Sequence, residues 1–114
     1  MARVYKILKA AEWAAAQRAG SFEGAAIDLT DGYIHLSTAA QASETARLHF
    51  AGQADLVLLR IDAAALGGAL RWEVSRGGQL FPHLYGPLQC ALVEAAMPIA
   101  LGAGGTPELG ELLP

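Results

Sequence analysis

The apolar run LVLLRI, within the segment Asp55–Asp62, constrains the fold of this chain more than any other feature. Arg60 is the one charged residue in the run, so its side chains do not alternate between a polar and an apolar face. A nearly continuous apolar run of this length is typical of a central strand that is covered on both sides. The chain has 114 residues, which is the usual size of one domain, so we expect a single core around this strand.

Several segments before this run also have clear patterns. Val4–Leu8 alternates as a strand does, and the alanine-rich segment Ala10–Ala19 predicts a helix that ends at Gly20. Residues 21–31 are polar and contain glycine, which predicts a loop. Tyr33–Ser37 predicts a second strand.

A helix is expected to follow the second strand. Thr38 and Gln41 have the spacing of a capping box, in which the hydroxyl accepts a hydrogen bond from a free backbone N–H and the glutamine side chain reaches back. The sequence therefore predicts a helix from Ala39 to about Phe50 that ends near Gly52.

The second half of the chain predicts a hairpin and a last strand. Leu70–Ser75 alternates, a Gly-Gly pair turns the chain, and Leu80–Tyr85 is the expected partner strand. Pro82 lacks a backbone N–H, which favours an edge or an irregular position for this partner strand. A last strand is expected within Gln89–Ala100.

These segments together predict an α+β fold with a single domain over residues 1–101. From Gly102 onward the composition shifts to glycine, proline and acidic residues, so residues 102–114 are expected to form a C-terminal surface tail. The residues expected in the core are those on apolar strand faces: Ile34, Leu36, Val57, Leu59 and Trp72.

Composition excludes several classes of protein. Hydrophobic residues make up 54% of the chain and charged residues 17%, so the chain can bury a sizeable core. The net charge of -3 argues against a large nucleic-acid surface. Cys90 is the only cysteine, so no internal disulfide can form, and neither a signal peptide nor a transmembrane run is visible. A cytoplasmic protein without a membrane segment is the expectation.

His35 is the first candidate for a functional residue. By the period of two in a strand, Ile34 and Leu36 point to one face, while Tyr33, His35 and Ser37 point to the other. That second face is polar without being charged. A histidine there either binds a ligand or satisfies a backbone carbonyl beneath a loop.

His83 and Glu73 are the other candidates. His83 lies in FPHLYG, an irregular segment stiffened by proline, which is expected either to position a site or simply to clamp a loop. Glu73 follows Trp72 on its strand, and a carboxylate there can act as a general base or accept a hydrogen bond from a ribose hydroxyl. We expect His35 and His83 to line one cleft, with Tyr33, Tyr85 or Glu73 in the same wall. His49 is expected to be a partly exposed residue near the C-terminus of its helix.

The same segments resemble a small bacterial family known only as domain of unknown function 952. The resemblance covers Arg3 to about Leu101 and rests on YKIL, DGYIHLST, DLVLLRID, WE and FPHLYGPL. It implies a fold related to the ADP-ribosyltransferases, a split mixed β-structure with flanking helices that holds NAD in a cleft. YIHLS also resembles the H-[IV]-H-L-S stretch of the RNA 2′-phosphotransferases, with Tyr33 in place of the first histidine.

The resemblance implies NAD or an ADP-ribose-like nucleotide as the ligand, and transfer chemistry of the ADP-ribosyltransferase type. Cleavage of the nicotinamide–ribose bond builds positive charge on the ribose, so a carboxylate and well-placed hydrogen bonds are needed. His35 would hold a ribose hydroxyl or the carboxamide, and Glu73 would supply the carboxylate. The implied catalytic residues are His35, Glu73 and His83, and the implied cofactor-binding residues are Tyr33, Ser37, Thr38 and Tyr85.

Two other interpretations stay open. The chain has only 8 lysines and arginines, few for gripping a pyrophosphate, which is compatible with a non-catalytic module that binds a nucleotide or a small metabolite. Alternatively, His35, His83 and Glu73 have the ligand types of a metal-binding facial triad, although no local spacing supports one.

Overall fold

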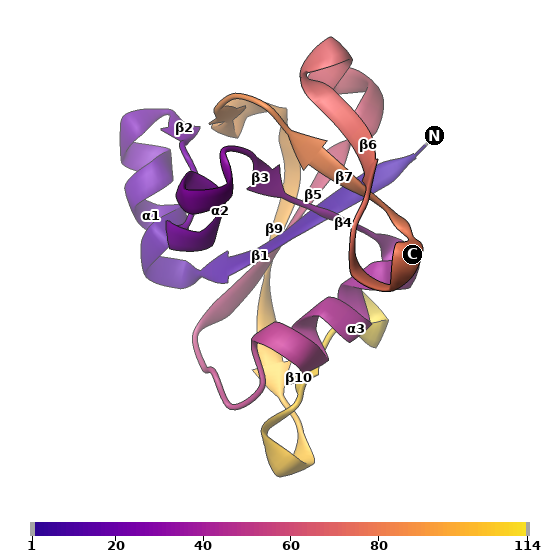
Figure 1. Ribbon diagram of the computed structural model, residues 1–114. Coiled ribbons are helices and arrows are strands. Elements are labelled where there is room, and N and C mark those ends of the chain that lie inside the picture. The colour runs from indigo at the N-terminus through magenta and orange to yellow at the C-terminus, as the bar shows by residue number, and fades with distance from the viewer. Residues whose placement is uncertain (1, 114) are drawn as a thin grey trace.

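The main sheet of the protein has β5 at its centre. The computed structural model describes residues 2–113, and its largest sheet has the strand order β10-β9-β5-β1-β4 (Figure 1). Strand β5 pairs with both β1 and β9, as the LVLLRI run predicted. The bounds are β1 (Arg3–Lys9), β4 (Ser37–Thr38), β5 (Leu56–Asp62), β9 (Val93–Leu101) and β10 (Pro107–Glu108).

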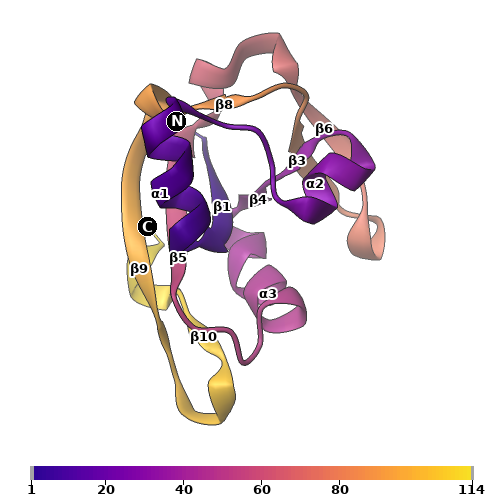
Figure 2. The ribbon, with the colours of Figure 1, turned by 90° about the vertical axis from the view of Figure 1, so that its left-hand side faces the viewer.

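Two small sheets and three α-helices complete one α+β domain (Figure 2). The strands of the small sheets are β3 (Ile34–His35), β7 (Leu80–Leu84) and β6 (Leu70–Val74), in that order, and β2 (Ser21–Phe22) with β8 (Leu88–Gln89). The helices are α1 (Ala10–Ala19), α2 (Ala26–Asp31) and α3 (Ala39–His49). All strand pairs within residues 2–113 are antiparallel, so the expected mixed sheet is wrong.

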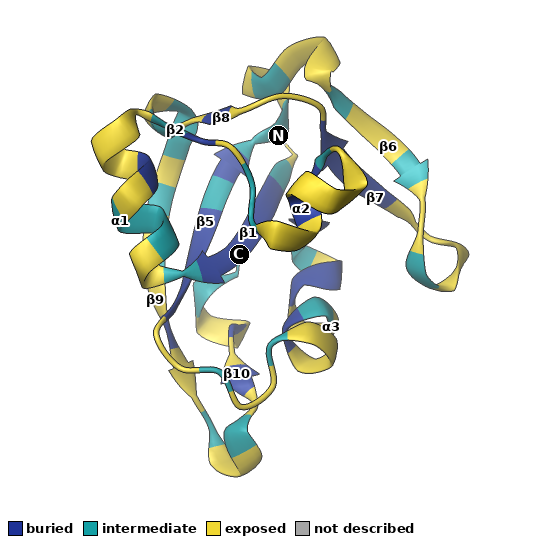
Figure 3. Ribbon diagram, turned by 60° about the vertical axis from the view of Figure 1, so that its left-hand side comes forward, coloured by how far each residue is buried: buried dark blue, intermediate teal, exposed yellow. Residues whose placement is uncertain are grey.

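Apolar residues cover both faces of the main sheet. Leu59 belongs to a buried cluster that includes residues of α1, β3 and β7, whereas the neighbouring Leu58 belongs to a cluster that includes residues of α3. Successive residues of a strand point to opposite faces, so α1 and α3 pack on opposite sides of β5. Figure 3 shows β5 and much of β1 as buried. Of the predicted core residues, Ile34, Leu36, Val57 and Leu59 are buried.

Helix α3 begins as its sequence predicted. The Thr38 hydroxyl accepts a hydrogen bond from Gln41 N, and the Gln41 side chain accepts one from Thr38 N, which is the reciprocal pattern of a capping box. The helix ends at His49, one residue earlier than the expected end. Among residues 2–113, no helix is long and apolar enough to cross a membrane.

The segment predicted as one strand, Tyr33–Ser37, splits between two sheets. Strand β3 pairs with β7, β4 pairs with β1, and Leu36 between them donates its N–H to the carbonyl of Pro82. The N–H that would return this hydrogen bond is missing in proline, so the ladder between β3 and β7 ends here. Strand β7 lies in the middle of its sheet and not at the expected edge. This position is tolerated because the side of Pro82 that lacks an N–H faces Leu36, so no hydrogen bond to β6 is lost.

The structure corrects two other predictions from sequence. Residues 21–31 contain β2 and α2 in place of a loop, and α2 carries Asp28 and Asp31. The expected surface tail also contributes to the fold, because β10 pairs with β9 and Leu109 is buried in the cluster beside α3.

Trp72 lies on the surface and not in the core. Trp72 is 43% exposed. Strand β6 is at the edge of its sheet, and Figure 3 shows most of it as exposed. We therefore expect Trp72→Ala to lower the free energy of unfolding by about 1 kcal/mol or less. Urea denaturation of the variant measures this effect, and a loss of about 3 kcal/mol or more would instead indicate a core position.

Candidate functional site

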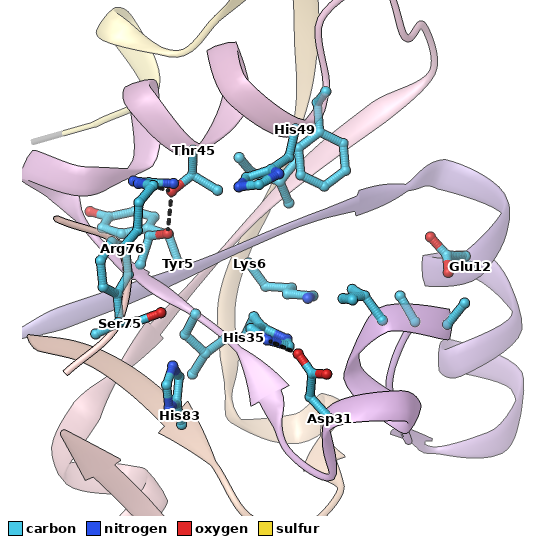
Figure 4. A pocket seen from close by; sticks show the side chains of 18 residues that line it. Tyr5, Lys6, Glu12, Asp31, His35, Thr45, His49, Ser75, Arg76 and His83 are labelled. Carbon is cyan, nitrogen blue, oxygen red and sulfur yellow. Dashed lines mark hydrogen bonds and ion pairs between the residues drawn. The ribbon is translucent and has the colours of Figure 1, made fainter. Parts of the chain in front are cut away.

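The main pocket lies beside the part of β1 that β4 does not cover. Strand β4 pairs only with Val4 and Tyr5 among the described residues, whereas β5 continues along β1 to Lys9. A cavity of about 810 Å³ opens beside the uncovered part, with walls from α2, β3, β7 and α3 (Figure 4). A volume of this size suits a small-molecule ligand. Polar residues that line it include Lys6, Asp31, His35, Thr45, Arg76 and His83.

His35 is held in this wall by Asp28. Its Nδ1 lies 2.6 Å from Asp28 Oδ1, and its backbone N–H donates to the same oxygen at 3.0 Å. Because a carboxylate only accepts hydrogen bonds, Nδ1 carries a hydrogen and donates a hydrogen bond to Asp28. The buried carboxylate of Asp28 therefore fixes both the ring and the backbone of His35.

Asp28 is also the counter-charge of a buried lysine. Lys6 Nζ lies 2.9 Å from Asp28 Oδ2 and 3.1 Å from Oδ1, and both side chains are almost fully buried. Ala25 N–H donates to Oδ2 as well, at 2.8 Å. Burial alone would raise the pKa of Asp28, but the hydrogen bonds from His35 and Ala25 and the charge of Lys6 hold it well below its usual range. Burial lowers the pKa of Lys6 despite the nearby carboxylate.

The second ring nitrogen of His35 faces another carboxylate. His35 Nε2 lies 2.9 Å from Asp31 Oδ2, and both side chains are about one-third exposed, at 31% and 37% (Figure 4). Both nitrogens of this ring therefore face carboxylate oxygens, and only the imidazolium form can donate to both. Asp31 is the last residue of α2, so the ring of His35 links α2 to β3.

His83 lies next to His35 and has its own carboxylate. The two histidines are register partners across β3 and β7, with ring centroids 5.7 Å apart. His83 Nδ1 lies 2.8 Å from Glu73 Oε1, and the Tyr85 hydroxyl donates to the same oxygen at 2.8 Å. These two hydrogen bonds lower the pKa of Glu73. In the neutral ring this leaves His83 Nε2 as a hydrogen-bond acceptor.

The residues predicted for the site fall into two groups. His35, His83 and Ser37 line the pocket, as expected for the two histidines. Tyr33, Glu73, Tyr85 and Thr38 are not among its lining residues. Tyr33 instead stacks on His83, with centroids 4.1 Å apart, and Thr38 uses its hydroxyl to cap α3. The Ser37 hydroxyl lies 3.1 Å from that of Thr45.

Several residues of the site were missed by the sequence analysis. Asp28, which holds His35, and the lining residue Asp31 lie in the segment that was expected to be a loop. Lys6 lies in the predicted strand Val4–Leu8, in which no site residue was proposed. The one signal available for Lys6 is a charge within the otherwise apolar segment YKIL. Nothing in the sequence marks Glu12 or Arg76, both of which line the pocket.

The metal-site interpretation has no geometric support. Within residues 2–113, no group of three or more histidine, cysteine, aspartate or glutamate side chains is arranged to hold a metal ion. Glu73 contacts His83 but is not itself one of the residues that line the pocket.

The fold and the pocket define a small antiparallel α+β domain with two carboxylate-oriented histidines in one wall. A family model described as "Protein of unknown function (DUF952)" matches residues 7–96, and the chain therefore belongs to this family. The crystal structure of protein CC0527 from Caulobacter crescentus is similar, with 54% identity over 96% of each chain and a TM-score of 0.95. The solution NMR structure of CC0527 matches 97% of this chain and 96% of that chain, with 54% identity and a TM-score of 0.88. No curated relative matches the chain.

Proposed function

We propose that the pocket binds a nucleotide-like small molecule, of which NAD and ADP-ribose are the first candidates, and that His35 anchors it. The observation that carries this proposal is the pair of histidines in one wall of an 810 Å³ pocket, each oriented by a carboxylate. Side chains held in this way have little freedom to lose when a ligand binds. The resemblance of the segment YIHLS to the H-[IV]-H-L-S stretch of the RNA 2′-phosphotransferases suggests the class of ligand.

The polar groups of the pocket suit such a ligand. His83 has one ring nitrogen, Nε2, that Glu73 does not contact, and Arg76 brings a guanidinium that ion-pairs with no carboxylate of residues 2–113. Apolar side chains such as Ile27 and Phe50 line other parts of the cavity. A mixture of a few fixed polar groups and apolar surface is typical of small-molecule sites.

Binding is better supported than group transfer. A transferase that cleaves the nicotinamide–ribose bond needs a carboxylate at the reacting carbon. Glu73, the residue expected for that role, accepts hydrogen bonds from His83 and Tyr85 and is not a lining residue. We therefore assign Glu73 the role of a positioning residue for His83 and favour the non-catalytic binding module.

Titration calorimetry with NAD and ADP-ribose tests this function. We expect wild-type protein to bind at least one of them, and His35→Ala to weaken that binding by about tenfold or more, because the ring that lines the pocket and holds Asp31 in place is lost. Gln17→Ala is the control, since Gln17 is exposed on α1, does not line the pocket and should leave the affinity within about threefold. Thermal unfolding of each variant checks that the fold is intact. The absence of heat with either ligand at millimolar concentration would contradict the proposal.

A further inference from the structure

We infer that Asp31 and His35 act together as a binding site for a vicinal diol of the ligand, such as the cis-diol of a ribose. This inference rests on the proposed function for the source of the diol, and it assigns to Asp31 a role that the sequence did not suggest. The two side chains lie 2.9 Å apart on the pocket wall, where Figure 4 shows them side by side.

The two aspartates that contact His35 have different capacities to bind a ligand. Asp28 is buried and already accepts hydrogen bonds from Lys6, Ala25 and both the ring and the backbone of His35. Its oxygens have no room for another donor. Asp31 is 37% exposed on its side chain, lines the pocket, and has His35 as its one polar partner among the described residues. Its carboxylate can therefore accept further hydrogen bonds, and only a ligand or solvent can supply them.

A hydroxyl group suits the free side of the Asp31 carboxylate better than an anion does. His35 Nε2 holds one oxygen of this carboxylate at 2.9 Å, and a ligand hydroxyl can donate a hydrogen bond to the lone pairs that His35 leaves free. A ligand anion at the same place would face the charge of Asp31.

A neighbouring hydroxyl makes the site specific for a diol. The second oxygen of the Asp31 carboxylate can accept from an adjacent hydroxyl, since a carboxylate takes two donors side by side. Two aromatic rings occupy other sides of His35. The ring of Tyr33 lies 4.7 Å from it, centroid to centroid, and the ring of His83 packs in an edge-on arrangement. The diol is therefore expected to enter from the open side of the pocket, against Asp31.

Calorimetry with ADP, 2′-deoxy-ADP and 3′-deoxy-ADP tests this inference, because ADP has a single cis-diol. We expect wild-type protein to bind ADP about tenfold or more tightly than either deoxy analogue, as expected for a hydrogen bond to a charged group. Asp31→Asn should weaken ADP binding and remove the discrimination. Glu44→Gln, which changes an exposed carboxylate of α3 that does not line the pocket, should keep both.

Further probes separate failure of this inference from failure of the proposed function. Equal affinity of wild-type protein for ADP and its deoxy analogues, or discrimination that survives in Asp31→Asn, would overturn the diol site while leaving nucleotide binding intact. Ribose 5-phosphate and free ribose are titrated in parallel. Binding of these sugars that requires Asp31, without binding of any nucleotide, would support the diol site and contradict the nucleotide ligand. No binding of any of these probes would overturn both.

Discussion

Asp28→Asn is expected to lower the free energy of unfolding by about 3–5 kcal/mol, the usual cost of removing one partner from a buried ion pair. The asparagine keeps the shape of the aspartate but has no charge. Lys6 would then be buried without a counter-charge, because Asp28 is the carboxylate in ion-pair contact with it. The variant would also weaken the hydrogen bonds to the ring and backbone of His35. Denaturant unfolding measures the loss.

Glu44→Gln is the control for this experiment. Glu44 forms an ion pair with Arg47 on the exposed surface of α3. Loss of this surface ion pair should not shift the denaturant midpoint of unfolding measurably. A second comparison adds Lys6→Met to the Asp28→Asn variant, which removes the orphaned charge and should restore part of the stability. A loss for Asp28→Asn no larger than that for Glu44→Gln would show that the buried pair does not stabilise the fold.

The same carboxylate should make stability depend on pH. The pKa of Asp28 is lower in the folded state than in the unfolded chain, so the folded state binds this proton less readily. Its contribution to stability is then complete above the unfolded pKa of about 4 and is lost as the pH falls toward the folded pKa. Wild-type protein should therefore lose more stability than Asp28→Asn between about pH 5 and pH 2.

Leu58→Ala and Leu59→Ala are each expected to lower the free energy of unfolding by about 2–5 kcal/mol. The two residues are adjacent in β5 and fully buried, and they belong to clusters on opposite faces of the sheet. Each truncation removes packed methyl groups and leaves a cavity on its own side. Large losses at both positions, measured by denaturant unfolding, would demonstrate that β5 is covered on both faces.

Leu48→Ala provides a matched truncation on the surface. Leu48 lies in α3 and is 45% exposed, so this variant should lose about 1 kcal/mol or less. If either strand variant lost no more than Leu48→Ala, the corresponding face of β5 would not be part of a packed core.

The sequence correctly predicted those helices and strands whose signal comes from residues close together in the chain. The apolar run around Leu58 identified the central strand, and Thr38 with Gln41 identified the start of α3. The alternation in β6 was also read correctly, but alternation tells only which residues share a face. Which face is buried depends on what packs there, so Trp72 was wrongly assigned to the core.

The site depends on contacts between residues far apart in the chain, and this limits what the sequence reveals. Lys6 and Asp28 are 22 positions apart, and no local spacing connects them. Their pairing becomes visible only when α2 lies against β1. His35 and His83 were expected to share a cleft, and the register of β3 with β7 places them opposite each other. The functional roles of these residues stay predictions.

The arrangement of charges suggests why this pocket can be both stable and open. The buried Lys6–Asp28 pair and the capped helix α3 hold the walls, while the exposed Asp31 and the partly buried Arg76 retain hydrogen-bonding capacity toward the cavity. The groups that stabilise the fold are thus distinct from those proposed to bind the ligand. Variants of Asp31 should accordingly affect binding more than stability.

The most direct test of the proposed function is a long-range proton–nitrogen NMR spectrum of the histidine rings, recorded while ADP-ribose is added. Each of the three histidines gives its own signals, and His35→Ala and His83→Ala spectra assign them. We predict that the signals of His35 and His83 shift progressively and reach saturation as the pocket fills. Ring signals of both residues that stay unchanged at millimolar ADP-ribose would contradict the account.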